Sequence, residues 1–276
     1  MPAAERPLTA RSVLASTLLG TDPPRLPVSF LVRTGSLFGL TEGAVRTALS
    51  RMAAAGELHS DGDGWYALTG DLVARQARQQ QGRAAATSDD WSGRWTMAVV
   101  EAGARPAAER AELRAAMQRL RLAELREGVW LRPDNLDPER QPGASAVVAA
   151  QCRRFAVEPA TSLDATEEQL VAQLWDLDGW STDALDLRRR MHELLPRLQA
   201  GDSDALAPGF VLSAAVLRHF GVDPLLPREL LPRRWAGAAL RADYDRYDAA
   251  YRALLAGWVG SPTSEGAAGR PLRSRP

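Results

Sequence analysis

Two arginines and two hydroxyl side chains fall on one face of a short helix predicted between Thr41 and Ala55. Guanidinium groups and hydroxyls can reach base edges and phosphates, and small residues let a helix enter the major groove of DNA. The candidate DNA-binding residues on this helix are Thr41, Gly43, Arg46, Thr47, Ser50 and Arg51. The same residues also suit an ordinary solvated helix face, and the pattern alone leaves both interpretations open.

The opposite face of this helix predicts how it is held in place. Its apolar residues recur at i, i+3, i+4 and i+7 and form one stripe, which comprises Val45, Ala48, Leu49 and Met52. Thr41 is a suitable N-cap, and Gly56 stands where a C-terminal glycine is common. We therefore expect the stripe to be buried.

The segments around this helix predict a winged helix-turn-helix over residues 1–88. Apolar helices are expected within 8–19 and 28–38, joined by a turn-rich connector at 21–27. Asp-Gly-Asp-Gly, between two strand-like runs, predicts a hairpin that would form the wing. The acidic tip of this hairpin suits phosphate contact poorly.

A polar helix is expected to follow the hairpin, from Asp71 to Arg83, and to lead into a linker. Its arginines could meet the phosphate backbone, which attracts cations whatever the base sequence. Arg75 and Arg78 are therefore further candidate DNA-binding residues, together with Arg83.

Residues 89–165 predict a small α+β domain. A strand is expected within 94–103, a helix over 105–125 and a second strand at 128–133. A loop follows, and then strand-like runs over 145–159. The order strand, helix, strand, strand is typical of a ferredoxin-like unit, although no second helix is expected between the second strand and residue 145.

Residues 166–260 predict an all-α domain. Thr166 and the two glutamates after it suit the start of a first helix. The last long helix carries Tyr244, Tyr247 and Tyr251 at i, i+3 and i+7. The Gly, Pro, Ser and Arg-rich residues 261–276 are expected to form a disordered tail. The fold class is thus α+β and multidomain.

Composition limits the functional classes. The 34 basic residues, all arginine, balance 34 acidic ones, so DNA binding would depend on a local basic face. The single cysteine, Cys152, permits no intrachain disulfide, and the three scattered histidines have no metal-ligand spacing. No catalytic motif, metal or cofactor is expected. Without a signal-peptide pattern or an apolar run of about 20 residues, a cytoplasmic protein with no membrane partner is expected.

Three motifs, taken in order, resemble the PaaX family of transcriptional repressors of phenylacetate-type catabolism. FGLTEGAVRTALSRMAAAGEL, followed by WYALT, resembles its N-terminal winged-helix domain. LRAAMQRLRLAELREGVWLRP resembles its central segment, and DPLLPRELLPRRWAG resembles its C-terminal signature. The resemblance extends over nearly the whole chain and favours the DNA-reading interpretation of the first helix face.

The resemblance implies a DNA-binding regulator with a small-molecule effector. We expect a homodimeric repressor that binds a palindromic operator in double-stranded DNA and is released by an acyl-CoA-type effector, such as an aryl-CoA thioester. Arg218, His219 and Trp235 flank the DPLLP run and are the candidate effector-binding residues. A purely structural role in the core is the alternative for each of them.

A metal-dependent nuclease is the alternative function. A ferredoxin-like unit with an acid after its first strand, here Glu101, resembles small nucleases that pair two such acids across a dimer around a metal ion. Only one such acid is evident in this sequence.

Overall fold

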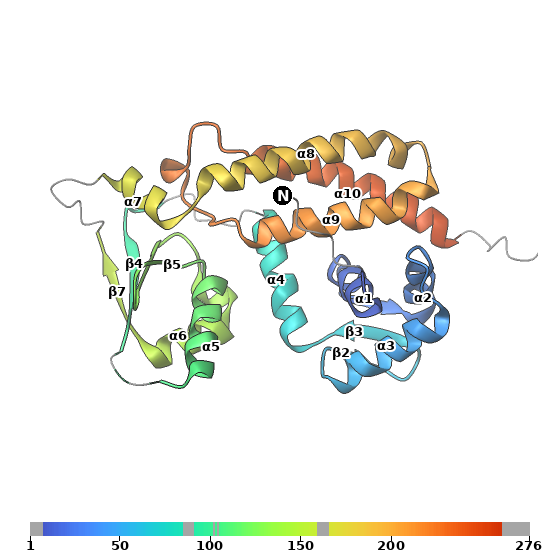
Figure 1. The fold of residues 1–276 in the computed structure, drawn as a ribbon, viewed down its shortest axis with the longest axis horizontal. Coiled ribbons are helices and arrows are strands. Elements are labelled where there is room, and N and C mark those ends of the chain that lie inside the picture. The colour runs from blue at the N-terminus through green and yellow to red at the C-terminus, as the bar shows by residue number, and fades with distance from the viewer. Residues whose placement is uncertain (1–7, 85–90, 102, 104, 159–165, 261–276) are drawn as a thin grey trace, which may run out of the picture.

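The computed structural model describes residues 8–84, 91–101, 103, 105–158 and 166–260, which form three bodies (Figure 1). The fold is the α+β three-domain architecture predicted from the sequence. The predicted linker and C-terminal tail fall largely or wholly outside these residues. The N-terminal winged domain comprises α1 (Ala10–Leu19), β1 (Arg25–Pro27), α2 (Val28–Ser36), α3 (Glu42–Ala54), β2 (Leu58–Ser60), β3 (Trp65–Leu68) and α4 (Gly70–Ala84).

The helix predicted at Thr41 to Ala55 is present as α3. The Oγ1 atom of Thr41 accepts a hydrogen bond from the Ala44 backbone N–H at 3.2 Å, which satisfies one of the free donors of the first turn. Gly56 follows the helix with a φ of 71°, a conformation that favours glycine. Val45, Leu49 and Met52 are buried in the core of the winged domain, as the stripe predicts.

The winged domain also contains a strand that the sequence pattern does not reveal. The segment 21–27 was expected to be only a connector, but Arg25–Pro27 forms β1 and pairs antiparallel with Trp65–Ala67 of β3. The sheet order is β1-β3-β2. Three residues beside two prolines show no alternation of their own, so the pairing depends on a partner forty residues away.

The central domain has the predicted ferredoxin-like topology. Its elements are β4 (Trp95–Val100), α5 (Ala107–Arg119), β5 (Ala123–Arg126), β6 (Val129–Pro133), α6 (Pro142–Gln151) and β7 (Cys152–Val157). The sheet order is β5-β6-β4-β7, and every neighbouring pair is antiparallel. Helices α5 and α6 pack on one face of this sheet through a shared apolar core.

Two predictions for this domain are wrong in detail. Residues 145–151 are helical and belong to α6, so the second helix of the ferredoxin-like unit, thought to be absent, is present. The Ala-Val-Val-Ala-Ala run is apolar on all sides, and such a short run cannot be assigned to strand or helix by periodicity. Residues 123–125, assigned to the preceding helix, form part of β5 instead.

The C-terminal domain consists of α7 (Glu167–Leu174), α8 (Leu177–Gln199), α9 (Leu206–Gly221) and α10 (Gly237–Gly260). Thr166 and Gln169 cap α7 reciprocally. This short helix packs against the sheet face that α5 and α6 leave uncovered, where Val171 joins a cluster with Trp95 and Leu131. Tyr244, Tyr247 and Tyr251 of α10, which recur at i, i+3 and i+7, are buried in the core of the bundle.

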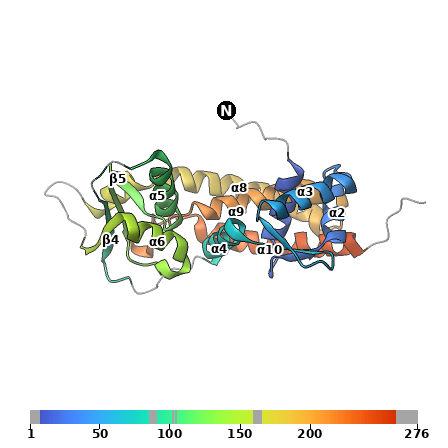
Figure 2. The same cartoon turned by 90° about the horizontal axis from the view of Figure 1, so that it is seen from below.

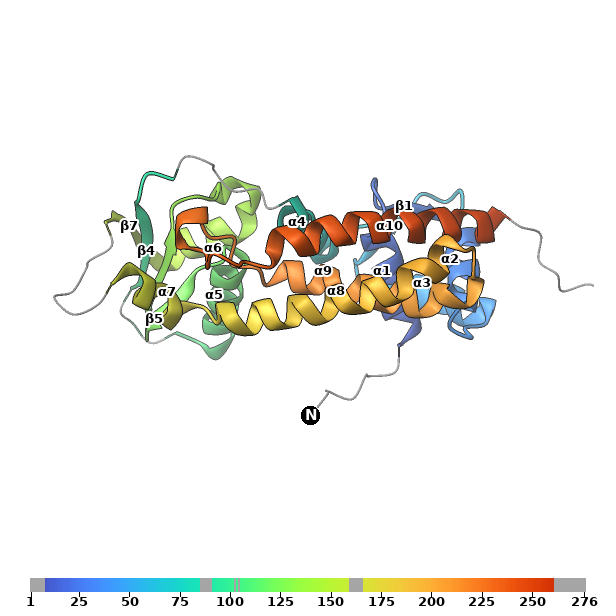
Figure 3. The same cartoon turned by 90° about the horizontal axis from the view of Figure 1, so that it is seen from above.

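The long helices α8, α9 and α10 extend above both other domains (Figures 1 and 3). At one end the central domain attaches through Arg121, a residue with a φ of 59° directly after α5. Its guanidinium donates to the carbonyls of Gly221 at 3.2 Å and of Asp223, at the C-terminus of α9. Burial lowers the pKa of Arg121 to about 10. At the other end the bundle covers the winged domain. Within the ranges that the structure describes, no helix is long and apolar enough to cross a membrane.

Candidate nucleic-acid interface and its connection to the helical bundle

One face of α3 is open to solvent on the side of the winged domain that points away from the bundle (Figures 1 and 2). All six candidate residues on or beside this helix are exposed: Thr41, Gly43, Arg46, Thr47, Ser50 and Arg51. The structure thus brings them together on one surface. Nothing lies within 4 Å of the place that a Cβ atom would occupy at Gly43, so the helix surface is flat there.

Arg46 is already oriented by a neighbour on the same helix. Its Nε atom donates to Glu42 Oε1 at 2.8 Å, one turn earlier, and both side chains are more than half exposed. Exposed pairs at this spacing contribute only about 0.3–0.5 kcal/mol. The contact therefore orients the guanidinium group but can be exchanged for a contact with DNA at little cost.

The wing is braced by its own acidic residue. Asp61 Oδ1 accepts hydrogen bonds from the backbone N–H groups of Asp63 at 3.0 Å and Trp65 at 3.1 Å. Its carboxylate also pairs with Arg25 of β1, whose guanidinium lies over the Trp65 ring. The hydrogen bond from Arg25 lowers the pKa of Asp61. This carboxylate thus serves the hairpin itself, which agrees with the prediction that the tip suits phosphate poorly.

The arginines of α4 have different surroundings from those of α3. Arg75 and Arg78 are only partly exposed, and burial lowers the pKa of both. The Nη1 atom of Arg78 is buried without a hydrogen-bond partner in the described part of the chain. Helix α4 packs along α9, so these two side chains lie at a domain junction. The prediction that they contact DNA phosphates stays a prediction.

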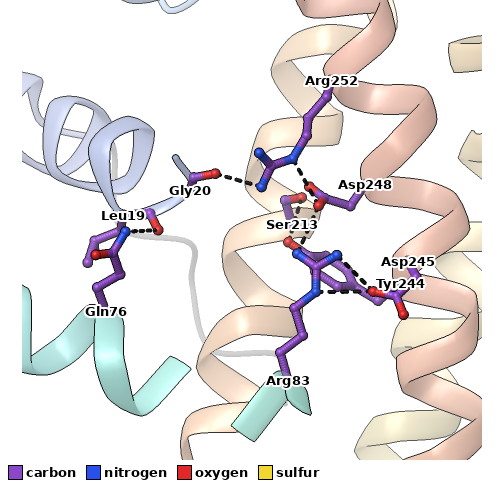
Figure 4. A network of polar contacts seen from close by, with 9 residues as sticks. All are labelled: Leu19, Gly20, Gln76, Arg83, Ser213, Tyr244, Asp245, Asp248 and Arg252. Atoms are coloured by element: carbon purple, nitrogen blue, oxygen red, sulfur yellow. Dashed lines mark hydrogen bonds and ion pairs between the residues drawn. The ribbon is translucent and has the colours of Figure 1, made fainter. Parts of the chain in front are cut away.

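Arg83, at the end of α4, ties this helix to α10 (Figure 4). Its guanidinium pairs with Asp245 at 2.7 Å and with Asp248 at 2.9 Å. Asp248 also pairs with Arg252 at 2.9 Å, and Arg252 donates in turn to the carbonyl of Gly20, at the C-terminus of α1. A continuous polar network therefore joins the C-terminal ends of α1 and α4, both in the winged domain, to α10 of the bundle.

Gly82 permits the closest approach in this junction. A Cβ atom at this position would lie 2.3 Å from the backbone oxygen of Phe220 in α9. The carbonyl of Gly82 accepts two hydrogen bonds from Arg241, at 2.9 and 2.6 Å, and Arg241 also pairs with the buried Asp223 at 2.6 Å. Any side chain at position 82 would push α4 away from α9.

The structure places two of the three candidate effector residues around a third aromatic ring. His219 and Trp235 both stack on Trp180 of α8, each with ring centroids 4.3 Å apart. His219 Nε2 also lies 3.1 Å from the Trp180 carbonyl oxygen, and burial lowers the pKa of His219. Arg218 is exposed. In this arrangement the rings are packed on each other and join α8, α9 and the start of α10.

The glutamines of α4 are not among the residues that the sequence predicts to be functional. Leu72, Gln76 and Gln79 recur at i, i+4 and i+7 and are all buried, so polar residues occupy the stripe where a core would be expected. Gln76 Nε2 donates to the Thr21 carbonyl at 2.7 Å. Glutamine at core spacing was the signal that this helix has a polar buried face.

The residue on which the nuclease alternative depends, Glu101, pairs with Arg153 at 2.9 Å, and both side chains are exposed. Within the described residues, no group of three or more His, Cys, Asp or Glu side chains could hold a metal ion. Cys152 is buried, and burial raises the pKa of its thiol.

Comparison with known families gives three matches in chain order. Residues 9–72 match the model of PaaX-like proteins, residues 88–167 match that of the PaaX protein central Cas2-like domain, and residues 175–259 match that of the PaaX-like protein C-terminal domain. A solved structure of the uncharacterized protein Rv0674 from Mycobacterium tuberculosis is 39% identical, with a TM-score of 0.62. The match covers 91% of this chain and 98% of that one. No curated protein matches the chain.

Proposed function

Because the chain belongs to the PaaX-like family, we propose that it is a homodimeric transcriptional repressor that binds a palindromic operator through α3 and is released by an acyl-CoA-type effector. Membership of this family points to a transcriptional regulator that binds DNA. The observation that carries the proposal is the open face of α3, which presents two arginines and two hydroxyls while its other face is fixed in the core.

The geometry of α3 is that of a helix held rigidly and left uncovered. Its N-terminus is capped by Thr41, and its apolar stripe is buried. The side chains of Arg46, Thr47 and Ser50 project into solvent from consecutive turns. A helix of this kind fits the major groove, in which arginine recognises guanine by two hydrogen bonds.

Dimerisation is proposed through the central domain, where β7 is an edge strand of the sheet. An unpaired edge offers backbone donors and acceptors to a second strand. Phe155 on this strand is 46% exposed and would be available to pack in such a dimer. A two-fold dimer would place its two α3 helices in major grooves about 34–36 Å apart or a multiple of this distance.

Effector release is proposed as a shift between two dimer forms. An effector that binds better to the form in which the two α3 helices are wrongly spaced lowers the affinity for the operator. The candidates Arg218, His219 and Trp235 lie at the C-terminal half of α9 and the approach to α10, close to where α4 attaches the winged domain. We propose an aromatic or related catabolic operon as the target.

The test measures binding of the full chain to labelled duplexes from the DNA that flanks its gene, by fluorescence anisotropy at several salt concentrations. Tight binding to one duplex, with much weaker binding to a scrambled duplex, is expected. A panel of acyl-CoA thioesters is then titrated into the complex. Equal affinity for all duplexes would overturn operator recognition, and a panel without any releasing compound would overturn the effector part of the proposal.

The nuclease alternative is checked in the same samples. Incubation of the labelled duplexes with Mg²⁺ should leave them intact. Degradation that needs Mg²⁺ and is lost in Glu101→Ala would replace the repressor proposal.

A further inference from the structure

A cavity of about 270 Å³ lies between the winged domain and the helical bundle. Residues of α1, β1, α2 and α4 line one side, and residues of α9 and α10 line the other. Most of the wall is apolar and includes Leu19, Leu26, Phe30, Phe210, Leu217 and Leu255. The contact from Arg252 to Gly20 drawn in Figure 4 forms part of its boundary.

Three of the residues that line this cavity are buried polar side chains, and each has an oxygen atom without a hydrogen-bond partner among the described residues. They are Thr34 (Oγ1), Gln79 (Oε1) and Tyr251 (OH), and they are 1%, 7% and 6% exposed. A buried polar atom without a partner costs about 1–3 kcal/mol, so three around one cavity indicate a ligand that supplies the partners. The three residues come from α2, α4 and α10, so both domains contribute.

The wall of the cavity also carries an unpaired positive charge. Arg75 lines it and forms no hydrogen bond or ion pair with the residues that the structure describes. Burial lowers the pKa of Arg75, and the nearby guanidinium groups of Arg218 and Arg11 lower it further. Asp248 lines the cavity too, but its carboxylate is already paired with Arg83 and Arg252. The cavity therefore favours an anion over a cation.

We propose that this cavity binds a compact aryl or branched-alkyl carboxyl compound. Its apolar body lies against Leu26, Phe30 and Leu217, and its carboxyl oxygens accept hydrogen bonds from Thr34, Tyr251 and Arg75. The amide of Gln79 can turn about its last bond to present its NH₂ group to the same oxygens.

The size of the cavity decides how much of a ligand it encloses. Ligand pockets usually measure about 300–1,000 Å³, so this cavity suits a single ring and its carboxyl group. A whole CoA thioester is far larger. A second cavity of about 240 Å³ lies next to the first and shares Gly20, Gln79 and Arg252 with it. The free acid and the acyl end of a thioester are the two sources of the same chemistry.

The position between two domains gives the ligand a regulatory effect. A ligand that touches α1 and α2 on one side and α9 and α10 on the other stabilises one orientation of the winged domain on the bundle. Because α1 and α2 pack against α3, this orientation sets the direction of the proposed DNA-reading face. This consequence, unlike the binding itself, rests on the proposed function.

The experiment is calorimetric titration of the full chain, without DNA, with phenylacetate and separately with phenylacetyl-CoA. One binding site per chain for at least one of them is expected, and the better ligand identifies the source. Thr34→Val and Tyr251→Phe should each weaken binding about three- to tenfold, the effect of one lost hydrogen bond. Both variants should unfold at or above the wild-type temperature, because each removes an unpaired buried oxygen.

Tyr247→Phe is the matched control. Its hydroxyl lies one turn earlier on α10 and donates to the Gly209 carbonyl at 3.0 Å. This variant should bind the ligand as wild type does, even if it unfolds at a lower temperature.

The result that overturns the inference is either no binding of both compounds, or binding by Thr34→Val and Tyr251→Phe that equals wild type. Operator binding is measured on the same proteins without ligand. Ligand binding without operator recognition would refute the proposed function and support this site. Operator recognition without ligand binding would support the proposed function and refute this site.

Discussion

Helices α3 and α4 belong to the same winged domain, and both carry arginines, but they differ in what surrounds them. Arg46 and Arg51 of α3 are exposed, and Arg46 has only a neighbouring glutamate as a partner. Arg75, Arg78 and Arg83 of α4 are partly buried against the bundle. Residue type alone therefore does not identify a DNA contact, because the surroundings of each guanidinium group depend on the elements that pack against it.

The glycines of the two helices show the same contrast. Gly43 of α3 faces open space, whereas a Cβ atom at Gly82 of α4 would collide with the backbone of α9. Helix α3 is open to solvent at Gly43, whereas α4 is closely fitted to α9 at Gly82. Four substitutions test this contrast.

Gly82→Ala should have the largest effect. Alanine normally favours a helix over glycine by about 1 kcal/mol. Here we expect a loss of about 2–3 kcal/mol, because α4 and α9 must separate to admit the methyl group. Thermal unfolding of the full chain, followed by circular dichroism, measures this. Gly43→Ala is the control and should not lower the unfolding temperature; equal behaviour of the two variants would mean that α4 is not closely fitted to α9.

Arg46→Ala should weaken binding to the specific duplex by about 1–3 kcal/mol if its guanidinium reads a base. Binding to a scrambled duplex should change much less, so the ratio of the two affinities falls. Anisotropy titrations with both duplexes measure it, with an unfolding curve to show that the fold is retained. A variant that binds the specific duplex as tightly as wild type would remove Arg46 from the DNA-reading face.

Arg83→Ala should lower the free energy of unfolding by about 1–2 kcal/mol. This is less than the loss of a fully buried ion pair, because Arg83 is partly exposed and Asp248 keeps Arg252 as a partner. Arg189→Ala removes two exposed ion pairs in α8, with Asp186 and Glu193, and serves as the control, with a change close to zero. If both variants behave alike, the network at the junction contributes no more than a surface pair.

Arg75→Ala should have the smallest effect. Arg75 is predicted to contact phosphate but lies at the junction, and the dependence of DNA affinity on salt concentration distinguishes the two roles: an unchanged slope would place Arg75 at the junction alone. A flatter slope, with equal weakening for all duplexes, would show that Arg75 contacts phosphate after all. In that case both α3 and α4 would take part in DNA binding, and the two helices would not differ in this respect.

Local signals in the sequence predicted most of the winged domain. The cap at Thr41, the stop at Gly56 and the stripe of Val45, Leu49 and Met52 act within one or two helical turns, and each is present in the structure. Two elements of the central domain, α6 and β5, were misread. Strand β5 pairs with β6 directly after it, and helix α6 packs against α5, which lies earlier in the chain. The alanine and valine run becomes a helix that lies beside α5 on the sheet and buries only Ala144, Ser145 and Val148, while Ala146, Ala149 and Ala150 are exposed.

The features of the junction could not be predicted in the same way. The sequence shows glutamines at core spacing in α4, but not that Gln76 meets the end of α1 or that Gln79 faces a cavity. The partners of Arg83 lie about 160 residues away, at Asp245 and Asp248. Such contacts arise when two domains dock, and no local pattern specifies the surface that a helix will meet.

The long helices of the bundle also set a distance between the other two domains. Helix α10 has 24 residues, which at 1.5 Å per residue gives about 36 Å, close to one turn of B-DNA. In a dimer joined through its central domains, as proposed, this rod sets how far each winged domain stands from the two-fold axis. The spacing of operator half-sites would then depend on the lengths of α8 and α10, which change by about 1.5 Å, with a rotation of about 100°, for each residue added.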